Sequence, residues 1–233
     1  MLLKANDVPE ITRLDFEPAT ARSYDALSAG HLDIISSDPS DRAHLELFAA
    51  AVLHAPGPVA DVGCGAGRLT AVLAELGLDA FGVDLSPALI AIARAANPHL
   101  RFEVGSMLDL DIPDGSLAGL LACYSIIHVP WELRPAVFAE FRRVLRPGGV
   151  LMLAYQVGSD AKHRDSHDGL ELDVTWYRQQ PGELAGLLRE AGFEVSHEAV
   201  RPAREGELTP HGHLLARAGG RPQEHDRGDL ADE

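Results

Sequence analysis

The residues best suited to chemistry surround a glycine-rich stretch, VADVGCGAGRLT, at positions 59–70. An apolar run there meets three glycines at alternate positions, beginning with Gly63, and Asp61 stands two residues before the first of them. Turns of this kind between a strand and a helix bind the phosphates of dinucleotides when they follow the pattern G-x-G-x-x-G. Here Arg68 occupies the place of the third glycine. The turn therefore indicates a ligand site without fixing the ligand.

Two acids narrow the choice of ligand. Asp84 ends the next strand-like run, about 20 residues after the first glycine, a spacing at which a carboxylate accepts both hydroxyls of an adenosine ribose. Asp61 would meet like charge beside a pyrophosphate, whereas an ammonium or sulfonium would stabilise it. A ligand with a ribose and a cationic end, but no pyrophosphate, satisfies both acids. S-adenosylmethionine meets this description.

A further group of candidates lies in CYSIIHVPW, at positions 123–131. His128 is the best candidate for a general base, because its unperturbed pKa of about 6.5 suits proton transfer near neutral pH. The alternative is that His128 only packs against the site or closes it. Tyr124, Tyr155 and Trp131 either line a pocket or pack in the core.

Strand-like and helix-like segments alternate along most of the chain. The strands are expected at 59–63, 80–85, 101–105, 117–127, 149–157, 193–201 and 211–218. The helices are expected at 38–55, where Ser40 or Asp41 can form the N-cap, and at 68–77, 87–96, 132–145 and 181–192. This alternation predicts an α/β fold with a doubly wound, mostly parallel sheet. Because no helix separates the last two strands, the final strand is expected to be antiparallel to its neighbours.

The candidate residues all fall at the carboxyl ends of expected strands, where open α/β sheets bind their ligands. At this point the sequence resembles a known family. VADVGCGAG, FGVDLSP, GSMLDLDIPDGS and RRVLRPGGVLML follow one another as in class I S-adenosylmethionine-dependent methyltransferases of small-molecule type. The resemblance spans about residues 45–218 and implies a Rossmann-like seven-stranded sheet with an antiparallel last strand.

The resemblance also implies roles for individual residues. Asp61 and the backbone of Gly63 would hold the methionine ammonium, and Asp84 the ribose. Leu85 would lie against the adenine, and the loop with Ser106 and Met107 would contact the adenine edge. Many relatives carry Asp where this chain has Ser106. An amino-terminal helix bearing Tyr24 would close over the cofactor. The cofactor site predicted in this way comprises Tyr24, Asp61, Gly63, Cys64, Gly65, Asp84, Leu85, Ser106, Met107 and Tyr124.

The resemblance and the composition also suggest how the chain is divided into parts. Residues 1–44 are expected to form an amino-terminal helical cap, and residues 45–218 the cofactor-binding domain. Within that domain, residues 155–180 are expected to be an insertion on the acceptor side. Residues 219–233 are polar, acidic and rich in glycine, which predicts a disordered tail.

Composition excludes several classes of function. The net charge of −15, from 20 basic and 35 acidic residues, argues against a nucleic-acid partner. No apolar run reaches the roughly 20 residues of a membrane-spanning helix. Two cysteines are typical of a protein in a reducing cytoplasm. The acids and histidines at 163–168 match no zinc spacing, so no metal is expected.

The sequence therefore predicts an enzyme that transfers a methyl group from S-adenosylmethionine to an oxygen or nitrogen of a small molecule. In-line displacement would depend on proximity, with His128 as the candidate base. A role in specialised metabolism is expected, as is a monomer or homodimer. Two alternatives stay open, a nicotinamide-dependent oxidoreductase and a non-catalytic module that binds S-adenosylmethionine. The first would require a glycine at Arg68 and is disfavoured by Asp61.

Overall fold

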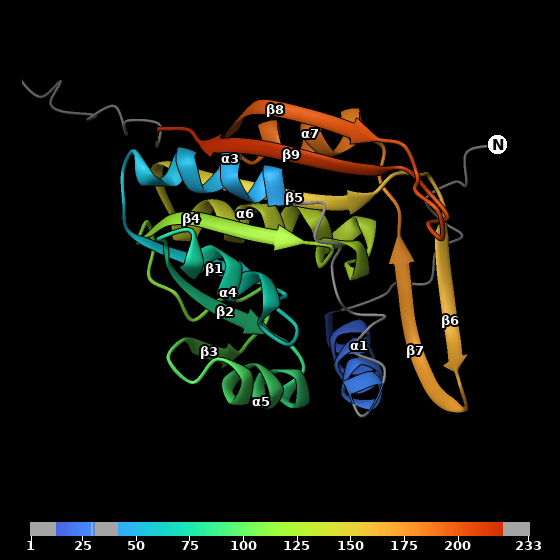
Figure 1. Ribbon diagram of the computed structural model, residues 1–233. Coiled ribbons are helices and arrows are strands. Elements are labelled where there is room, and N and C mark those ends of the chain that lie inside the picture. The colour runs from blue at the N-terminus through green and yellow to red at the C-terminus, as the bar shows by residue number, and fades with distance from the viewer. Residues whose placement is uncertain (1–12, 29, 31–41, 221–233) are drawn as a thin grey trace, which may run out of the picture.

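The computed structural model describes residues 13–28, 30 and 42–220, which build a seven-stranded sheet with helices on both faces (Figure 1). Five strands lie parallel in the order β3 (Arg101–Val104), β2 (Asp79–Asp84), β1 (Pro58–Val62), β4 (Leu117–Cys123) and β5 (Leu145–Gln156). Strand β9 (His211–Ala218) runs antiparallel between β5 and β8 (Phe193–Arg201). The predicted doubly wound sheet with a reversed last strand is confirmed.

The helices form two layers around this sheet. One face is covered by α3 (Arg42–Leu53), α4 (Arg68–Glu75) and α5 (Pro87–Ala96), and the other by α6 (Arg134–Val144) and α7 (Pro181–Glu190) (Figure 1). The central strand β4 is buried along its whole length, as expected for a parallel strand covered on both faces. Gly119 in β4 allows α3 to approach closely, because a Cβ there would lie 2.9 Å from the ring of Phe48.

Local sequence signals explain where α5 begins. The hydroxyl of Ser86 accepts a hydrogen bond from the Leu89 amide at 3.1 Å, and Pro87 stands in the first turn, where its missing N–H costs nothing. The helix therefore starts directly after Asp84 and Leu85, and its N-terminus lies at the edge of the sheet that was expected to bind the ligand.

The structure differs from the sequence expectation at two places that shape this edge. The strand expected to continue to residue 127 ends at Cys123, because Tyr124 adopts a left-handed backbone with φ of 54°. Two short 3₁₀ turns follow, Ile126–His128 and Trp131–Leu133, so α6 starts two residues later than expected. The expected insertion at 155–180 contains a separate hairpin, β6 (Ala161–His167) and β7 (Leu170–Tyr177).

Helix α1 (Arg13–Ser28) lies between α5 and the β6–β7 hairpin (Figure 1). The predicted boundary after residue 44 falls inside α3, which packs on the main sheet. The candidate N-caps Ser40 and Asp41, and residues 221–233 of the expected tail, lie outside the described residues.

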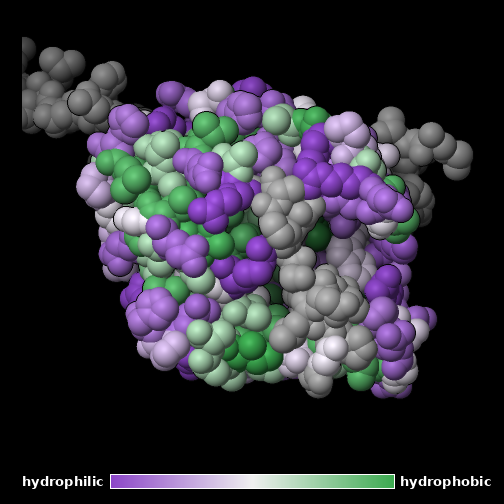
Figure 2. Space-filling model, in the orientation of Figure 1, coloured by the Kyte–Doolittle hydropathy of each residue, from purple (hydrophilic) through white to green (hydrophobic). Residues whose placement is uncertain are grey.

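The surface is mixed in character. On the face shown in Figure 2, hydrophilic residues are interspersed with smaller hydrophobic areas. None of the helices in the described part of the chain has the length and apolar character needed to cross a membrane.

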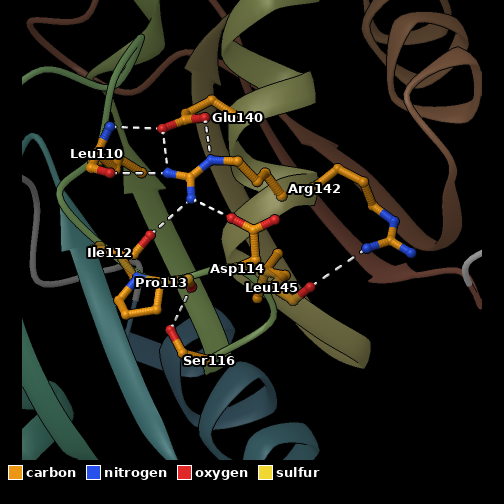
Figure 3. A network of polar contacts seen from close by, with 9 residues as sticks. Leu110, Ile112, Pro113, Asp114, Ser116, Glu140, Arg142 and Leu145 are labelled. Atoms are coloured by element: carbon orange, nitrogen blue, oxygen red, sulfur yellow. Dashed lines mark hydrogen bonds and ion pairs between the residues drawn. The ribbon is translucent and has the colours of Figure 1, made fainter.

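The loop that follows β3 is held to α6 by Arg143. Its guanidinium donates to both carboxylate oxygens of Glu140 at 2.7 Å and to Asp114 at 2.7 Å. It also donates to the carbonyls of Leu110 and Ile112, each at 2.9 Å. Figure 3 shows these partners converging on one point between loop and helix. Because hydrogen bonds between charged groups are the stronger kind, this cluster fixes the loop that carries Met107.

We expect Arg143→Met to lower the free energy of unfolding by about 2 kcal/mol, because two carboxylates and two carbonyls lose a charged donor. Arg42→Met is the matched control, since it removes an exposed ion pair with Glu46 within α3 and should cost less than about 0.5 kcal/mol. Chemical denaturation of both variants measures the difference. Equal losses would show that the Arg143 cluster adds no more than a surface pair.

Candidate active site at the carboxyl edge of the sheet

A cavity of about 490 Å³ opens at the carboxyl ends of β1, β2 and β4. It lies where the glycine turn, the end of β2 and the residues after β4 meet, and α1 and the hairpin also contribute to its wall. A volume in this range suits a small-molecule ligand. Among the residues that line it are Glu17, Tyr24, Asp61, Gly63, Cys64, Gly65, Arg68, Asp84, Leu85, Ser86, Met107, Tyr124, Ser125, His128, Gln156, Trp176, Glu207 and His211.

The glycine turn is close-packed against its neighbours. Gly63 has φ of 79°, and a Cβ on it would lie 2.2 Å from the Cβ of Ser125. Gly67 has φ of 81°, and a Cβ there would lie 2.8 Å from the ring of Phe102. Only glycine combines this backbone conformation with such close contact. The packing role of the third glycine in a dinucleotide turn thus passes to Gly67, which allows Arg68 to begin α4.

Asp84 is fixed by backbone donors from both sides. One carboxylate oxygen accepts from the Gly65 amide at 2.8 Å, and the other from the Ser86 amide at 2.9 Å. Burial raises the pKa of Asp84 and the nearby Asp25 carboxylate adds to this rise, whereas the amide donors oppose it. The carboxylate is therefore held at one position at the end of β2, facing the cavity.

Asp61 is almost fully buried at the end of β1, and its carboxylate accepts from the Thr70 hydroxyl at 2.7 Å. Burial raises the pKa of Asp61 to about 7, and the nearby Asp84 carboxylate also raises it. The hydrogen bond from Thr70 and the charge of Arg68 oppose this rise. A carboxyl group in this state favours a cationic partner, which would compensate the charge that burial destabilises.

Helix α1 covers the cavity and is attached on two sides. The Asp25 carboxylate accepts from the Ser86 hydroxyl and, at 3.1 Å, from the Ala88 amide at the N-terminus of α5, where the helix dipole favours a negative charge. On the other side the Ser23 hydroxyl accepts from the Asp173 amide of β7 at 2.7 Å. Helix α1 therefore covers the carboxyl edge of the sheet.

His128 makes a hydrogen bond with each ring nitrogen. Its Nδ1 lies 3.1 Å from the Thr175 carbonyl oxygen, which can only accept, so Nδ1 carries the hydrogen. In the neutral ring Nε2 then accepts from the Tyr24 hydroxyl at 2.6 Å. Burial lowers the pKa of His128 to about 4, although the bond to Thr175 opposes this shift. The arrangement joins α1, the turn after β4 and the hairpin.

A second tyrosine–histidine pair also lines the cavity. The Tyr124 hydroxyl is 2.8 Å from Nδ1 of His211, at the start of β9. Arg201 donates to the same nitrogen at 3.1 Å and forms two hydrogen bonds of 2.6 Å with Glu207. Arg201 holds the pKa of Glu207 down, at about 2.

The comparisons with known proteins agree with this geometry. A family described as a methyltransferase domain matches residues 59–149. A probable S-adenosylmethionine-dependent methyltransferase of Mycolicibacterium smegmatis is 31% identical over 143 residues, which cover 59% of this chain and 52% of that protein. Residues 59–149 therefore form a methyltransferase domain similar to that of S-adenosylmethionine-dependent methyltransferases.

Other relatives extend over more of the chain. A ubiquinone biosynthesis O-methyltransferase of Xanthomonas campestris pv. campestris is 29% identical over 210 residues, which cover 82% of this chain and 86% of that protein. The solved structure of a Burkholderia thailandensis 1,6-didemethyltoxoflavin-N1-methyltransferase shares the fold, with a TM-score of 0.73 and 21% identity over 94% of this chain and 98% of that one. The chain spans about half the length of the curated relatives that it matches at 30% identity or more.

The match to a methyltransferase domain favours a methyltransferase over the nicotinamide-dependent oxidoreductase. Every residue of the predicted cofactor site except Ser106 lines the cavity at the carboxyl edge of the sheet. The Ser106 hydroxyl instead donates to Glu17 of α1 and accepts from the Leu108 amide at 3.0 Å. Its contact with adenine stays a prediction.

Neither a reactive thiolate nor a metal centre is indicated by the described residues around the cavity. Burial raises the pKa of the Cys64 thiol, which disfavours a thiolate nucleophile. Within residues 13–28, 30 and 42–220, no cluster of three or more histidine, cysteine or carboxylate side chains could hold a metal ion.

Several residues of the cavity wall carry no signal in the sequence. They are Phe16, Gln156, Trp176, Glu207 and His211. These residues come from α1, the hairpin, the end of β5 and the loop before β9, so only the tertiary fold brings them to the site.

We expect His128 to contribute a loss of stability as the pH decreases from about 6.5 to about 4, because it is neutral when folded but takes up a proton when unfolded. The raised pKa values of Asp61 and Asp84 act in the opposite direction in this window. His128→Gln keeps an acceptor but cannot titrate, so the slope of its unfolding free energy against pH should be lower than that of the wild type by up to about 1.4 kcal/mol per unit. Urea denaturation across the window measures the slopes. His54→Gln, at an exposed residue directly after α3, controls for loss of a histidine. Parallel slopes for wild type and His128→Gln would contradict the prediction.

Proposed function

We propose that the protein transfers the methyl group of S-adenosylmethionine to an oxygen or nitrogen atom of a small-molecule acceptor. The observation that carries this proposal is the pair of fixed carboxylates, Asp61 and Asp84, that line one cavity beside the glycine turn. Their positions suit a ligand with a ribose at one end and a positive charge at the other. The ubiquinone-pathway relative is named an O-methyltransferase, which favours oxygen as the acceptor atom.

The residues present fit this cofactor. Asp84 would accept the ribose hydroxyls, since its oxygens are already oriented by the amides of Gly65 and Ser86. Gly65 has open space where a side chain would start, which leaves room for a ligand against the backbone. Asp61 and the backbone of Gly63 would hold the methionine ammonium, and Leu85 and Met107 would contact the adenine.

When bound, S-adenosylmethionine would supply an electrophilic methyl carbon attached to a sulfonium. The protein's share of the catalysis would then be to orient the acceptor at about 3–3.5 Å from that carbon and to exclude water. Helix α1 and the hairpin provide the cover, because Tyr24, Asp25 and Ser23 attach the helix to three neighbouring segments. We assign the amino-terminal region to closure over the cofactor and residues 155–180 to the acceptor side.

The ribose assignment predicts that Asp84→Asn weakens the binding of S-adenosylhomocysteine by about 100-fold or more, because hydrogen bonds to a charged group are worth about 1.5–3 kcal/mol each. Asp79→Asn, at the exposed opposite end of the same strand, should bind as the wild type does. Isothermal titration calorimetry of both variants, with NAD as a comparison ligand, provides the measurement. Unchanged affinity in Asp84→Asn, or binding of NAD alone, would refute the proposed function.

The ammonium assignment predicts a pH dependence of that affinity. A cationic ligand favours the ionised carboxylate of Asp61, whose pKa is about 7, so affinity should fall about tenfold per pH unit below about pH 7 and level off above it. Asp84 and Arg68 also act on this carboxylate, so the variant Asp61→Asn isolates its share. The variant should bind more weakly and with a shallower pH profile. The same steep profile in both proteins would show that another group binds the ammonium.

A further inference from the structure

The β6–β7 hairpin contributes one tryptophan to the cavity wall. In β7 the side chains of Leu172, Val174 and Trp176 share one face, because alternate residues of a strand point to the same side. Leu172 and Val174 are buried in a cluster with Leu27 of α1, whereas Trp176 is only partly buried and lines the cavity. The apolar face of the hairpin therefore continues from its contact with α1 into the cavity wall.

We propose that a planar aromatic acceptor stacks on Trp176, and that this contact selects such acceptors over saturated ones. The inference rests on the proposed function and names the acceptor class and a specificity-determining residue of the same cavity. An indole suits this role, because it offers a large, flat, apolar surface at a low cost in conformational entropy. A ligand that covers the remaining exposed part of the ring would also remove apolar surface from water.

Trp176 stands beside the residues predicted to hold the cofactor. Its ring centroid lies 5.6 Å from that of His128 with 63° between the planes, and the ring of His128 lies 5.2 Å from that of Tyr24 at 72°. Both are edge-to-face contacts of the kind that aromatic rings prefer. Because Tyr24 belongs to the predicted cofactor site, only one imidazole separates that site from the indole. A ring stacked on Trp176 would therefore lie next to the cofactor.

The guanidinium of Arg164 covers one face of the indole. It lies 5.4 Å from the ring centroid of Trp176, within the range of a cation–π contact. Arg164 comes from β6, where it pairs with Val174 of β7. The positive charge already placed over the ring disfavours a cationic ligand there. We therefore assign the other face of the indole to a neutral planar ring.

The backbone on both sides of Trp176 is held in place. Directly before it, the Thr175 carbonyl accepts from Nδ1 of His128 at 3.1 Å. Directly after it, the Tyr177 carbonyl accepts from the guanidinium of Arg134 at 2.9 Å. Arg134 is the first residue of α6 and is almost fully buried. The hairpin thus holds the indole against the turn after β4 and against α6, which lowers the entropy that ligand binding costs.

Two probes with the same carbon skeleton test the proposal. 2-Naphthol is planar and aromatic, and decahydro-2-naphthol is its saturated counterpart with the same hydroxyl group. Isothermal titration calorimetry measures the affinity of each probe for the protein saturated with S-adenosylhomocysteine. The wild type should bind 2-naphthol about fivefold or more tightly than decahydro-2-naphthol, because only a flat ring can stack on the indole.

Substitutions of Trp176 test whether that preference comes from the indole. Trp176→Leu keeps an apolar side chain but removes the ring, so it should weaken the binding of 2-naphthol by about 5- to 10-fold and that of decahydro-2-naphthol much less. Trp176→Met is a second variant without a ring, should Trp176→Leu not fold. Trp176→Phe restores a ring and should recover most of the loss.

The other tryptophan of the chain provides the matched control. Trp131 contacts the same hairpin, since its indole N–H donates to the Arg178 carbonyl at 3.0 Å, but it is not among the described residues that line the cavity. Trp131→Leu should therefore bind both probes as the wild type does.

The possible results separate this proposal from the proposed function. Selective loss of 2-naphthol in the ring-free variants, with recovery in Trp176→Phe, supports stacking on Trp176. Equal loss of both probes, no loss, the same loss in Trp131→Leu, or weaker binding of S-adenosylhomocysteine in Trp176→Leu would overturn it. A wild-type protein that binds S-adenosylhomocysteine but neither probe, or both probes alike, would overturn the acceptor class and leave the cofactor assignment intact. Failure of the wild type to bind S-adenosylhomocysteine would instead overturn the proposed function itself.

Discussion

The structure depends on keeping two carboxylates at the buried end of a parallel sheet. Asp61 and Asp84 end neighbouring strands, and a buried carboxylate destabilises the fold unless donors surround it. Thr70, Gly65 and Ser86 supply those donors, and each comes from a segment that directly follows β1 or β2. The tight glycine turn is required because the Gly65 amide must reach Asp84 while Gly63 packs against Ser125. Because burial still raises the pKa of Asp61 to about 7 despite the Thr70 hydrogen bond, a cationic ligand would stabilise this carboxylate further.

Polar contacts also decide how the cavity is covered. Helix α1 is attached through Tyr24, Asp25 and Ser23 to the turn after β4, to α5 and to the hairpin. Its apolar contribution is smaller, with Leu27 packing against Leu172 and Val174 of β7. Hydrogen bonds of this kind are worth about 1 kcal/mol each and can be exchanged for water. The cover is therefore attached largely by polar contacts, whereas α3 and α6 hold the sheet beneath it through the hydrophobic core.

The sequence was informative wherever function depends on neighbours along the chain. The alternation of apolar runs predicted the sheet, and the spacing of Asp61, the glycines and Asp84 predicted one site, because strand ends in a parallel sheet meet at one edge. It was silent on contacts made by distant segments. The hairpin was seen only as an insertion, since its alternating polar residues resemble a loop. The end of β4 was misplaced because nothing in YSIIH signals the left-handed conformation of Tyr124, which Ala154 and Val62 help to hold from neighbouring strands.

The two tyrosine–histidine pairs show why residue type alone does not assign a base. Both place a phenol against an imidazole at hydrogen-bond distance in one cavity. His128 is buried where α1, the turn after β4 and the hairpin meet, and its Nδ1 faces the Thr175 carbonyl. Burial lowers its pKa. His211 sits at the first residue of β9, within reach of an ionised carboxylate that Arg201 holds in place. From the sequence His128 was the stronger candidate, because it follows β4 in the expected position. The structure surrounds the two rings differently, because residues in the loop before β9 bring Glu207 to His211, whereas His128 contacts the backbone of the hairpin.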